Sequence, residues 1–160
     1  MISYVQKVLK FIISIIICQS AGIFGSLFTF DSISDWYVTL EKPTFAPPNW
    51  IFGPVSITLY FLMGLSLYIV WKDELKSKTR NAFFVVFGIQ LILNALWSFL
   101  FFGLRSPFLG LLDIILLDIM VIVTIIYAKS ISKLAIILLI PYLIWIVFAS
   151  FLNYVIFLVN

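Results

Sequence analysis

Five long apolar stretches, separated by short polar connections, follow one another along the chain. Each is long enough for the ~20 residues with which an α-helix crosses a hydrocarbon core of ~30 Å. Helices are expected because backbone polar groups in lipid must be paired within their own segment. The pattern therefore predicts an all-α integral membrane protein, with a single five-helix domain over residues 1–160. The expected spans are 8–28, 51–71, 81–102, 108–127 and 134–158.

The first stretch has two interpretations. Lys7 and Lys10 precede the apolar run, as they would in a signal peptide, but the run continues past the usual signal length. No small-x-small cleavage site follows a short core, so a membrane span is favoured. Small residues in this span predict a seam where another helix packs closely; they are Ala21, Gly22, Gly25 and Ser26.

The composition agrees with this interpretation. The chain is 64% hydrophobic and 11% charged, whereas soluble domains have roughly 45–50% apolar and about 25% charged residues. No basic patch is interleaved with aromatic residues, so nucleic acid is not an expected partner. With no histidine and one cysteine, Cys18, the chain lacks the commonest metal ligand and general base. Metalloenzyme chemistry is therefore not expected.

Lysine and arginine are divided unevenly between the two sides of the predicted bundle. Eight lie at the N-terminus and in the second and fourth connections, and two lie in the first and third connections. The positive-inside rule then predicts a cytoplasmic N-terminus, with the first connection and the C-terminus outside. The eight residues are Lys7, Lys10, Lys72, Lys76, Lys78, Arg80, Lys129 and Lys133, and the two are Lys42 and Arg105.

The first connection is rich in proline and aromatic residues. Each proline fixes φ, removes a backbone donor and pushes its predecessor toward extended conformations, so a stiff, non-helical run is expected. Its rings are typical either of an interfacial aromatic belt or of a lid that faces a ligand. The residues concerned are Trp36, Tyr37, Pro43, Phe45, Pro47, Pro48 and Trp50.

Three of the predicted helices carry a stripe of aromatic, small and amide side chains on one face. Such stripes are typical either of hydrogen-bonded helix contacts or of an aromatic cavity with a few orienting polar groups. At Ser56 we expect the hydroxyl to bond a backbone carbonyl one turn back. The stripes are Ser56, Tyr60, Gly64 and Trp71; Gln90, Asn94, Trp97 and Phe101; and Tyr142, Trp145, Ala149 and Asn153.

Two aspartates lie in the fourth span. Asp113 and Asp118 are about 140° apart around a helix, so they are not expected to form a paired acid and base. Asp113 is expected to face the bundle and accept hydrogen bonds. Asp118 is expected to face a partner, either within the bundle or in a dimer neighbour.

Four sequence blocks occur in order. They are W-Y-x-x-L-x-K-P-x-x-x-P-P-x-W-x-x-G-P-V (36–55), LYFLMG (59–64), QLILNALWSFLFFG (90–103) and PYLIWIVFASFLN (141–153). Together they resemble the tryptophan-rich sensory protein / translocator protein family (TspO/MBR, the peripheral benzodiazepine receptors). One departure stands out, because the family usually has Trp directly after the PV and this chain has Ser56.

The resemblance implies a five-helix bundle whose first connection folds over one end. It also implies a membrane receptor, sensor or transporter of flat hydrophobic ligands, with no covalent cofactor. Those ligands are tetrapyrroles such as protoporphyrin IX, benzodiazepine-like compounds and sterols. The residues implied as pocket wall or lid are Tyr37, Pro47, Trp50, Tyr60, Asn94, Trp97, Trp145 and Ala149, with Ser56 by position. Gln90, Asp113 and Asn153 are expected to be structural polar residues.

Two other functional classes stay open at this point. Porphyrin breakdown has been proposed for some family members, but Ser56 replaces one of the pocket tryptophans, so this chain is not expected to act as an enzyme. A structural or signalling membrane protein with an incidental pocket is the other class. We expect location in a bacterial cell membrane, with the lipid bilayer and small hydrophobic ligands as partners. The sequence does not decide whether the chain forms a homodimer.

Overall fold

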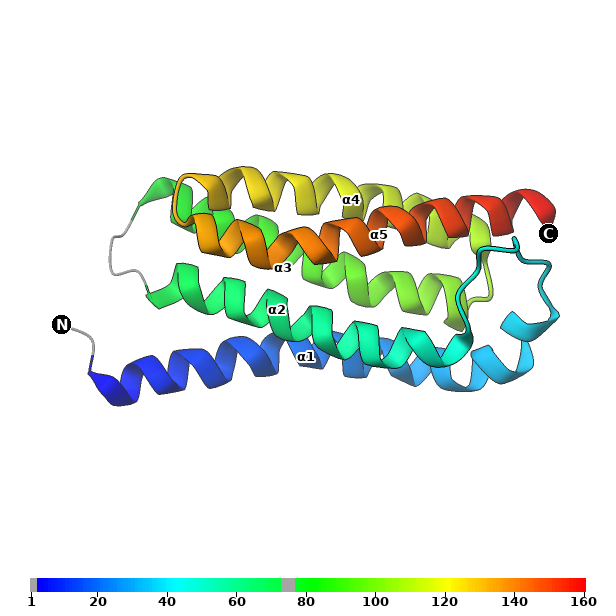
Figure 1. Cartoon of the computed structure of the whole chain (residues 1–160), viewed down its shortest axis with the longest axis horizontal. Coiled ribbons are helices and arrows are strands. Elements are labelled where there is room, and N and C mark those ends of the chain that lie inside the picture. Colours follow the sequence, from blue (N-terminus) through cyan, green and yellow to red (C-terminus); the bar gives the residue numbers. More distant parts are fainter. Residues whose placement is uncertain (1–2, 73–76) are drawn as a thin grey trace.

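The computed structural model describes residues 3–72 and 77–160, which are helical apart from short connections. Five long helices in these residues run side by side, each antiparallel to the one before it (Figure 1). The fold therefore confirms the predicted all-α bundle. The helices are α1 (Tyr4–Asp35), α2 (Phe52–Lys72), α3 (Lys78–Ser98), α4 (Pro107–Lys129) and α5 (Lys133–Val159).

The helices extend beyond the predicted spans because polar residues cap them outside the apolar stretches. The Ser3 hydroxyl accepts from the Gln6 N–H, and the Gln6 side chain accepts from the Ser3 N–H, which forms a capping box at the start of α1. The Ser77 and Ser106 hydroxyls cap α3 and α4 by accepting from the Arg80 and Leu109 N–H groups, and Pro107 occupies the first turn of α4. Hydropathy alone does not detect these caps.

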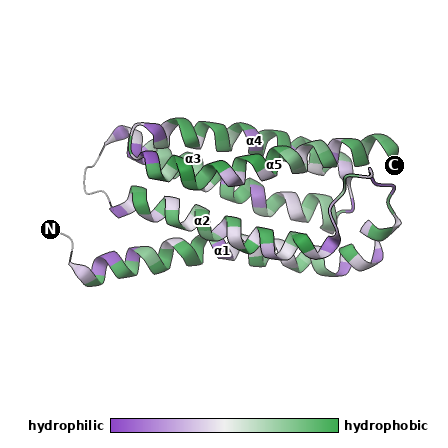
Figure 2. Cartoon of the chain, viewed as in Figure 1, coloured by the Kyte–Doolittle hydropathy of each residue, from purple (hydrophilic) through white to green (hydrophobic). Residues whose placement is uncertain are grey.

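The outer surface of the bundle is apolar. Hydrophobic residues cover the helices along most of their length, and hydrophilic residues gather toward the two ends (Figure 2). Large side chains such as Ile16, Ile92 and Ile144 are 61–68% exposed. All five helices are long and apolar enough to cross a membrane. The protein is therefore an integral membrane protein.

The first connection folds over the end of the bundle where α5 ends (Figure 1). It contains two short 3₁₀ turns, η1 (Tyr37–Thr39) and η2 (Asn49–Ile51), and the proline-rich segment between them includes a turn in which the Ala46 N–H donates to the Pro43 carbonyl. Phe45 stacks on Phe151 of α5, with ring centroids 5.4 Å apart. The Asn160 side chain accepts from the Glu41 N–H and donates to the Glu41 carbonyl, each at 2.9 Å. The connection is thus fastened to α5 at two points.

Tyr37 anchors the beginning of this connection. Its side chain is 2% exposed and packs against Phe101 and Phe102. Lys42 lies over the Tyr37 ring, 4.8 Å from its centroid, and donates to the Tyr37 carbonyl at 2.7 Å. Burial raises the pKa of the Tyr37 hydroxyl to about 12, so this group stays neutral at physiological pH.

The orientation in the membrane remains a prediction from the charge count. Of the residues counted, Lys76 lies outside the described residues. A reporter active only in the cytoplasm should be silent when fused after Asn160 and active when fused after Ser130, in the connection between α4 and α5. The positive-inside rule is the physical reason. A bright signal from the Asn160 fusion would show that the orientation is inverted.

Candidate functional site

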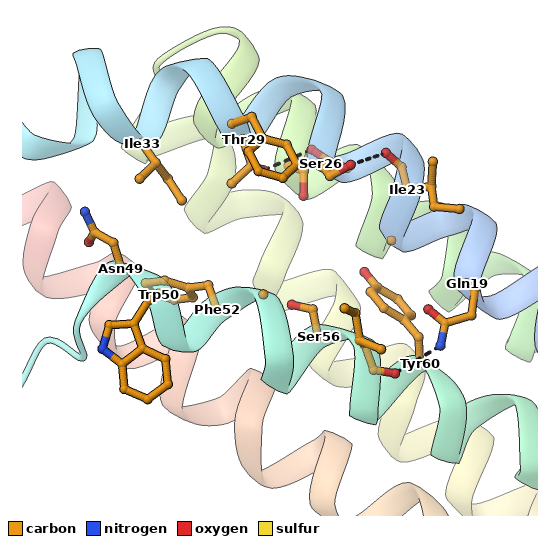
Figure 3. A pocket seen from close by; sticks show the side chains of 16 residues that line it. Gln19, Ile23, Ser26, Thr29, Ile33, Asn49, Trp50, Phe52, Ser56 and Tyr60 are labelled. Atoms are coloured by element: carbon orange, nitrogen blue, oxygen red, sulfur yellow. Dashed lines mark hydrogen bonds between the residues drawn. The ribbon is translucent and has the colours of Figure 1, made fainter.

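A groove of about 600 Å³ lies between α1 and α2, at the end of the bundle covered by the first connection. Side chains from the two helices face each other across it, with η2 at its left end (Figure 3). Its volume is within the range typical of small-molecule sites. The lining residues are Gln19, Gly22, Ile23, Gly25, Ser26, Thr29, Phe30, Ile33, Asn49, Trp50, Phe52, Gly53, Ser56, Ile57, Tyr60 and Ser98.

The groove forms because α1 packs on different partners along its length. Toward its start α1 lies tightly on α2, since a Cβ built on Gly64 would come within 3.0 Å of the Ile15 Cα. Toward its end α1 is held by η3 (Phe99–Gly103), the π-helical turn after α3, where the Ser32 hydroxyl donates to the Phe102 carbonyl at 2.8 Å. The Gln19 amide donates to the Ile57 carbonyl at 3.0 Å and bridges α1 and α2 at one end of the groove.

A second, smaller cavity of about 100 Å³ lies inside the bundle among α2, α3, α4 and α5. Two tryptophans, two tyrosines and one asparagine contribute to its wall, so it combines aromatic surface with a few polar groups. We call it the inner chamber. Its lining residues are Phe52, Ser56, Leu59, Tyr60, Asn94, Trp97, Ser98, Ile114, Leu117, Tyr142, Trp145, Ile146 and Ala149.

The groove and the inner chamber share four lining residues, Phe52, Ser56, Tyr60 and Ser98. We call these four residues the partition. Glycines of α1 make room for two of them: a Cβ on Gly22 would lie 2.7 Å from the Tyr60 ring, and one on Gly25 would lie 2.7 Å from the Ser98 Oγ. Gly22 and Gly25 of α1 therefore leave the space that Tyr60 of α2 and Ser98 of α3 occupy.

Two hydrogen-bonded chains hold the inner chamber together. In the first, the Tyr60 hydroxyl donates to the Asn94 carbonyl oxygen and the Asn94 amide donates to the Tyr142 hydroxyl, which links α2, α3 and α5. In the second, Trp97 Nε1 donates to Asn153 Oδ1 at 3.1 Å. Asn153 Nδ2 then donates to the Pro107 carbonyl at 2.8 Å. Both asparagines thus bond across helices, and the chamber wall has a fixed arrangement.

Most of the residues predicted for the pocket come together in the structure. Ser56, Tyr60, Asn94, Trp97, Trp145 and Ala149 all line the inner chamber, and Ser56 and Tyr60 also line the groove.

Three predicted residues of the first connection lie elsewhere or at the margin. Trp50 lines the groove, but its indole is 72% exposed and points away from α1 (Figure 3). Tyr37 and Pro47 line neither of the two cavities, and Tyr37 is instead packed in the aromatic cluster at the end of the bundle. The proline-rich connection therefore adjoins the site mainly through η2.

The polar residues that lie outside the two cavities differ in whether they form hydrogen bonds. Gln90 is completely buried, yet neither of its amide atoms has a hydrogen-bond partner in the described residues. Asp113 is 4% exposed, and its buried Oδ2 also has no partner there. The expectation that Asp113 accepts hydrogen bonds is therefore not met at Oδ2. Asp118 accepts from the Ser150 hydroxyl of α5 at 2.7 Å.

The two cavities are lined by uncharged side chains. Asp113 and Asp118 have different surroundings and line neither cavity. Among the described residues, no group of three or more His, Cys, Asp or Glu side chains could hold a metal ion. The cavities instead offer aromatic rings, aliphatic surface and uncharged hydroxyl and amide groups, which are suited to a flat apolar ligand with few polar groups.

The contribution of α1 to the site was not predicted. Its small residues were interpreted as a packing seam, yet Gly22, Gly25 and Ser26 line the groove. The polar residues Gln19, Ser26 and Thr29 are spaced seven and three positions apart, so they lie toward one side of the helix. This spacing within an apolar span is the signal that could have identified α1 as part of the wall.

Comparison with known proteins places this architecture in a family. The model of the TspO/MBR family matches residues 14–159. The chain is 51% identical to the tryptophan-rich protein TspO of Archaeoglobus fulgidus, over 97% of this chain and 99% of the relative. It is 41% identical to the human translocator protein, over 86% of this chain and 83% of the relative. It is 32% identical to protein CrtK of Rhodobacter capsulatus, over 94% and 92% of the two chains.

Proposed function

Because the chain belongs to the TspO/MBR family, we propose that it is a membrane receptor or sensor that binds flat, hydrophobic ligands in the groove and the inner chamber. Tetrapyrroles such as protoporphyrin IX are the first ligand class, and benzodiazepine-like compounds and sterols are the next. The observation that carries this proposal is the groove of about 600 Å³, which shares four lining residues with a chamber whose wall contains two tryptophans.

The two cavities suit different parts of such a ligand. A volume of about 100 Å³ is too small for a tetrapyrrole ring system, so the macrocycle belongs in the groove and a substituent belongs in the inner chamber. Burial of the flat ring face against groove residues such as Phe52 and Tyr60 supplies area and stacking. The groove is bordered by helices that face lipid, where an apolar ligand is already concentrated.

Titration of protoporphyrin IX into the purified protein, followed by quenching of Trp fluorescence, tests this proposal. Replacing Ser26 by Phe should fill the groove and weaken binding by about tenfold or more, since apolar contact area is lost. Ser20→Phe is the matched control, because Ser20 is an exposed residue of the same helix that does not line the groove. Equal affinity of the wild type and Ser26→Phe would place the ligand elsewhere.

The prolines of the first connection should slow ligand release. Pro48 precedes η2, and η2 carries the groove residues Asn49 and Trp50. Replacing Pro47 and Pro48 together by Gly adds conformational freedom, typically about 0.4–1 kcal/mol per site. We expect dissociation to become about fourfold faster, with a smaller change in association, in stopped-flow measurements.

A substitution to glycine at the other end of the bundle is the control for the double proline variant. Ser130→Gly lies in the turn between α4 and α5 and should leave the dissociation rate unchanged. If the double proline variant released ligand at the wild-type rate, the connection would be an interfacial anchor without influence on the site.

A further inference from the structure

Two hydroxyl groups of the partition have no hydrogen-bond partner among residues 3–72 and 77–160. Ser56 of α2 and Ser98 of α3 line both the groove and the inner chamber, and neither side chain makes a hydrogen bond to another described residue. The expectation that Ser56 bonds a carbonyl one turn back is therefore wrong.

Four hydroxyls of α1 and α2 near the groove show the usual behaviour for a membrane span. Ser20, Ser26 and Thr29 of α1 each donate to a carbonyl of their own helix at 2.6–2.9 Å. Thr58 of α2, two residues after Ser56, donates to the Pro54 carbonyl at 2.9 Å. This local bond is the common way for a hydroxyl to be satisfied in an apolar setting. The Ser14 hydroxyl of α1 also has no partner in the described residues, but Ser14 lines neither cavity, whereas the two partition serines line both.

The end of α3 and the space at Gly25 together determine where the Ser98 hydroxyl lies. Ser98 is the last residue of α3 and is followed by a π-helical turn, η3 (Phe99–Gly103). Gly25 provides the space for its Oγ, because any Cβ at that position would lie 2.7 Å from this oxygen. Turns of this kind are frequent at functional sites. The hydroxyl is held against α1 with its hydrogen-bonding capacity unused.

We propose that Ser56 and Ser98 form a hydrogen-bonding subsite, which binds an acceptor oxygen of a ligand whose flat body lies in the groove. The inference rests on the proposed function and specifies the ligand class within it. A carbonyl of an ester, acid or amide arm suits the subsite, since each serine can donate one hydrogen bond to it. A ligand with only hydrocarbon substituents leaves both donors unpaired at the junction, which lowers its affinity.

Two neutral porphyrins test this inference. Mesoporphyrin IX dimethyl ester carries two ester arms, whereas etioporphyrin carries only alkyl groups, and both have the same flat macrocycle. Both are titrated into the wild type, Ser56→Ala, Ser98→Ala and the double variant, with Trp fluorescence as the signal. Each single replacement should weaken binding of the ester by about three- to tenfold. Binding of etioporphyrin should change by less than about twofold.

The control is Thr58→Ala, which removes a hydroxyl of α2 that is bonded to its own helix and lines neither cavity. It should alter neither affinity. If the serine variants changed both porphyrins equally or changed neither, the subsite would be refuted while porphyrin binding itself stood. If the wild type bound neither porphyrin, the proposed function would fail, and the subsite with it.

Discussion

Replacing Gly64 by Val is expected to separate α1 from α2 and to destabilise the protein strongly. A Cβ at Gly64 would lie 2.8 Å from the Ile15 Cδ1, 3.0 Å from the Ile15 Cα and 3.1 Å from the Ser14 carbonyl oxygen. Two of these atoms belong to the backbone of α1, so they cannot move aside as a flexible side chain would. Overpacking of this kind costs about 1–3 kcal/mol or more, and thermal unfolding in detergent or nanodiscs measures it.

Gly88 supplies the matched control for this substitution. It also lies within a helix, but a Cβ there would meet nothing within 4 Å. Gly88→Val should therefore change the melting temperature only slightly, through backbone and rotamer effects. If the two valine variants melted at the same temperature, the close contact between α1 and α2 at Gly64 would not exist in the membrane protein.

Replacing Ser56 by Trp is expected to tighten the binding of an aromatic ligand that needs no hydrogen bond at the partition. Ser56 lines both cavities, so an indole there would narrow the junction and add a ring against the ligand. Aromatic pairs contribute about 0.5–1.5 kcal/mol beyond their area burial. For etioporphyrin this corresponds to about three- to tenfold tighter binding, measured by fluorescence quenching.

An ester-bearing porphyrin should gain less from Ser56→Trp, because the indole replaces one of the two serine donors. The control is Ile92→Trp, which adds an indole at a lipid-facing position of α3 that is 68% exposed. Illumination of the porphyrin complexes adds a second measurement. A new absorbing product from Ser56→Trp alone would show that a tryptophan at this position supports porphyrin chemistry. Unchanged affinity would show that residue 56 does not face the bound ligand.

The five spans could be predicted because each apolar stretch exceeds the thickness of a bilayer core. Their ends could be predicted less well, since they depend on caps such as Ser3 and Ser106. The π-helical turn after Ser98 was not foreseeable, because its residues, Phe-Leu-Phe-Phe-Gly, are apolar like the helix before them. Local composition does not encode how a helix adjusts its last turn against neighbouring helices.

The lining residues of the inner chamber could be predicted from the sequence better than those of the groove. Asn94 and Trp97 are three residues apart on α3, and Trp145 and Ala149 are four apart on α5, so helical spacing alone places each pair on one face. The groove arises from the packing of α1, which lies on α2 at Gly64 and on η3 at Ser32. That change of partner is a property of the assembled bundle, and a single sequence does not reveal it.

The bond between Glu41 and Asn160 has a consequence for biosynthesis. The two residues are 119 positions apart, and Asn160 follows all five membrane helices. Because a chain is made from its N-terminus, the first connection is synthesised long before its anchor. It can be fastened only after α5 has inserted beside its neighbours. The contact between Glu41 and Asn160 is therefore a late one, which forms only when the end of α5 lies beside the first connection.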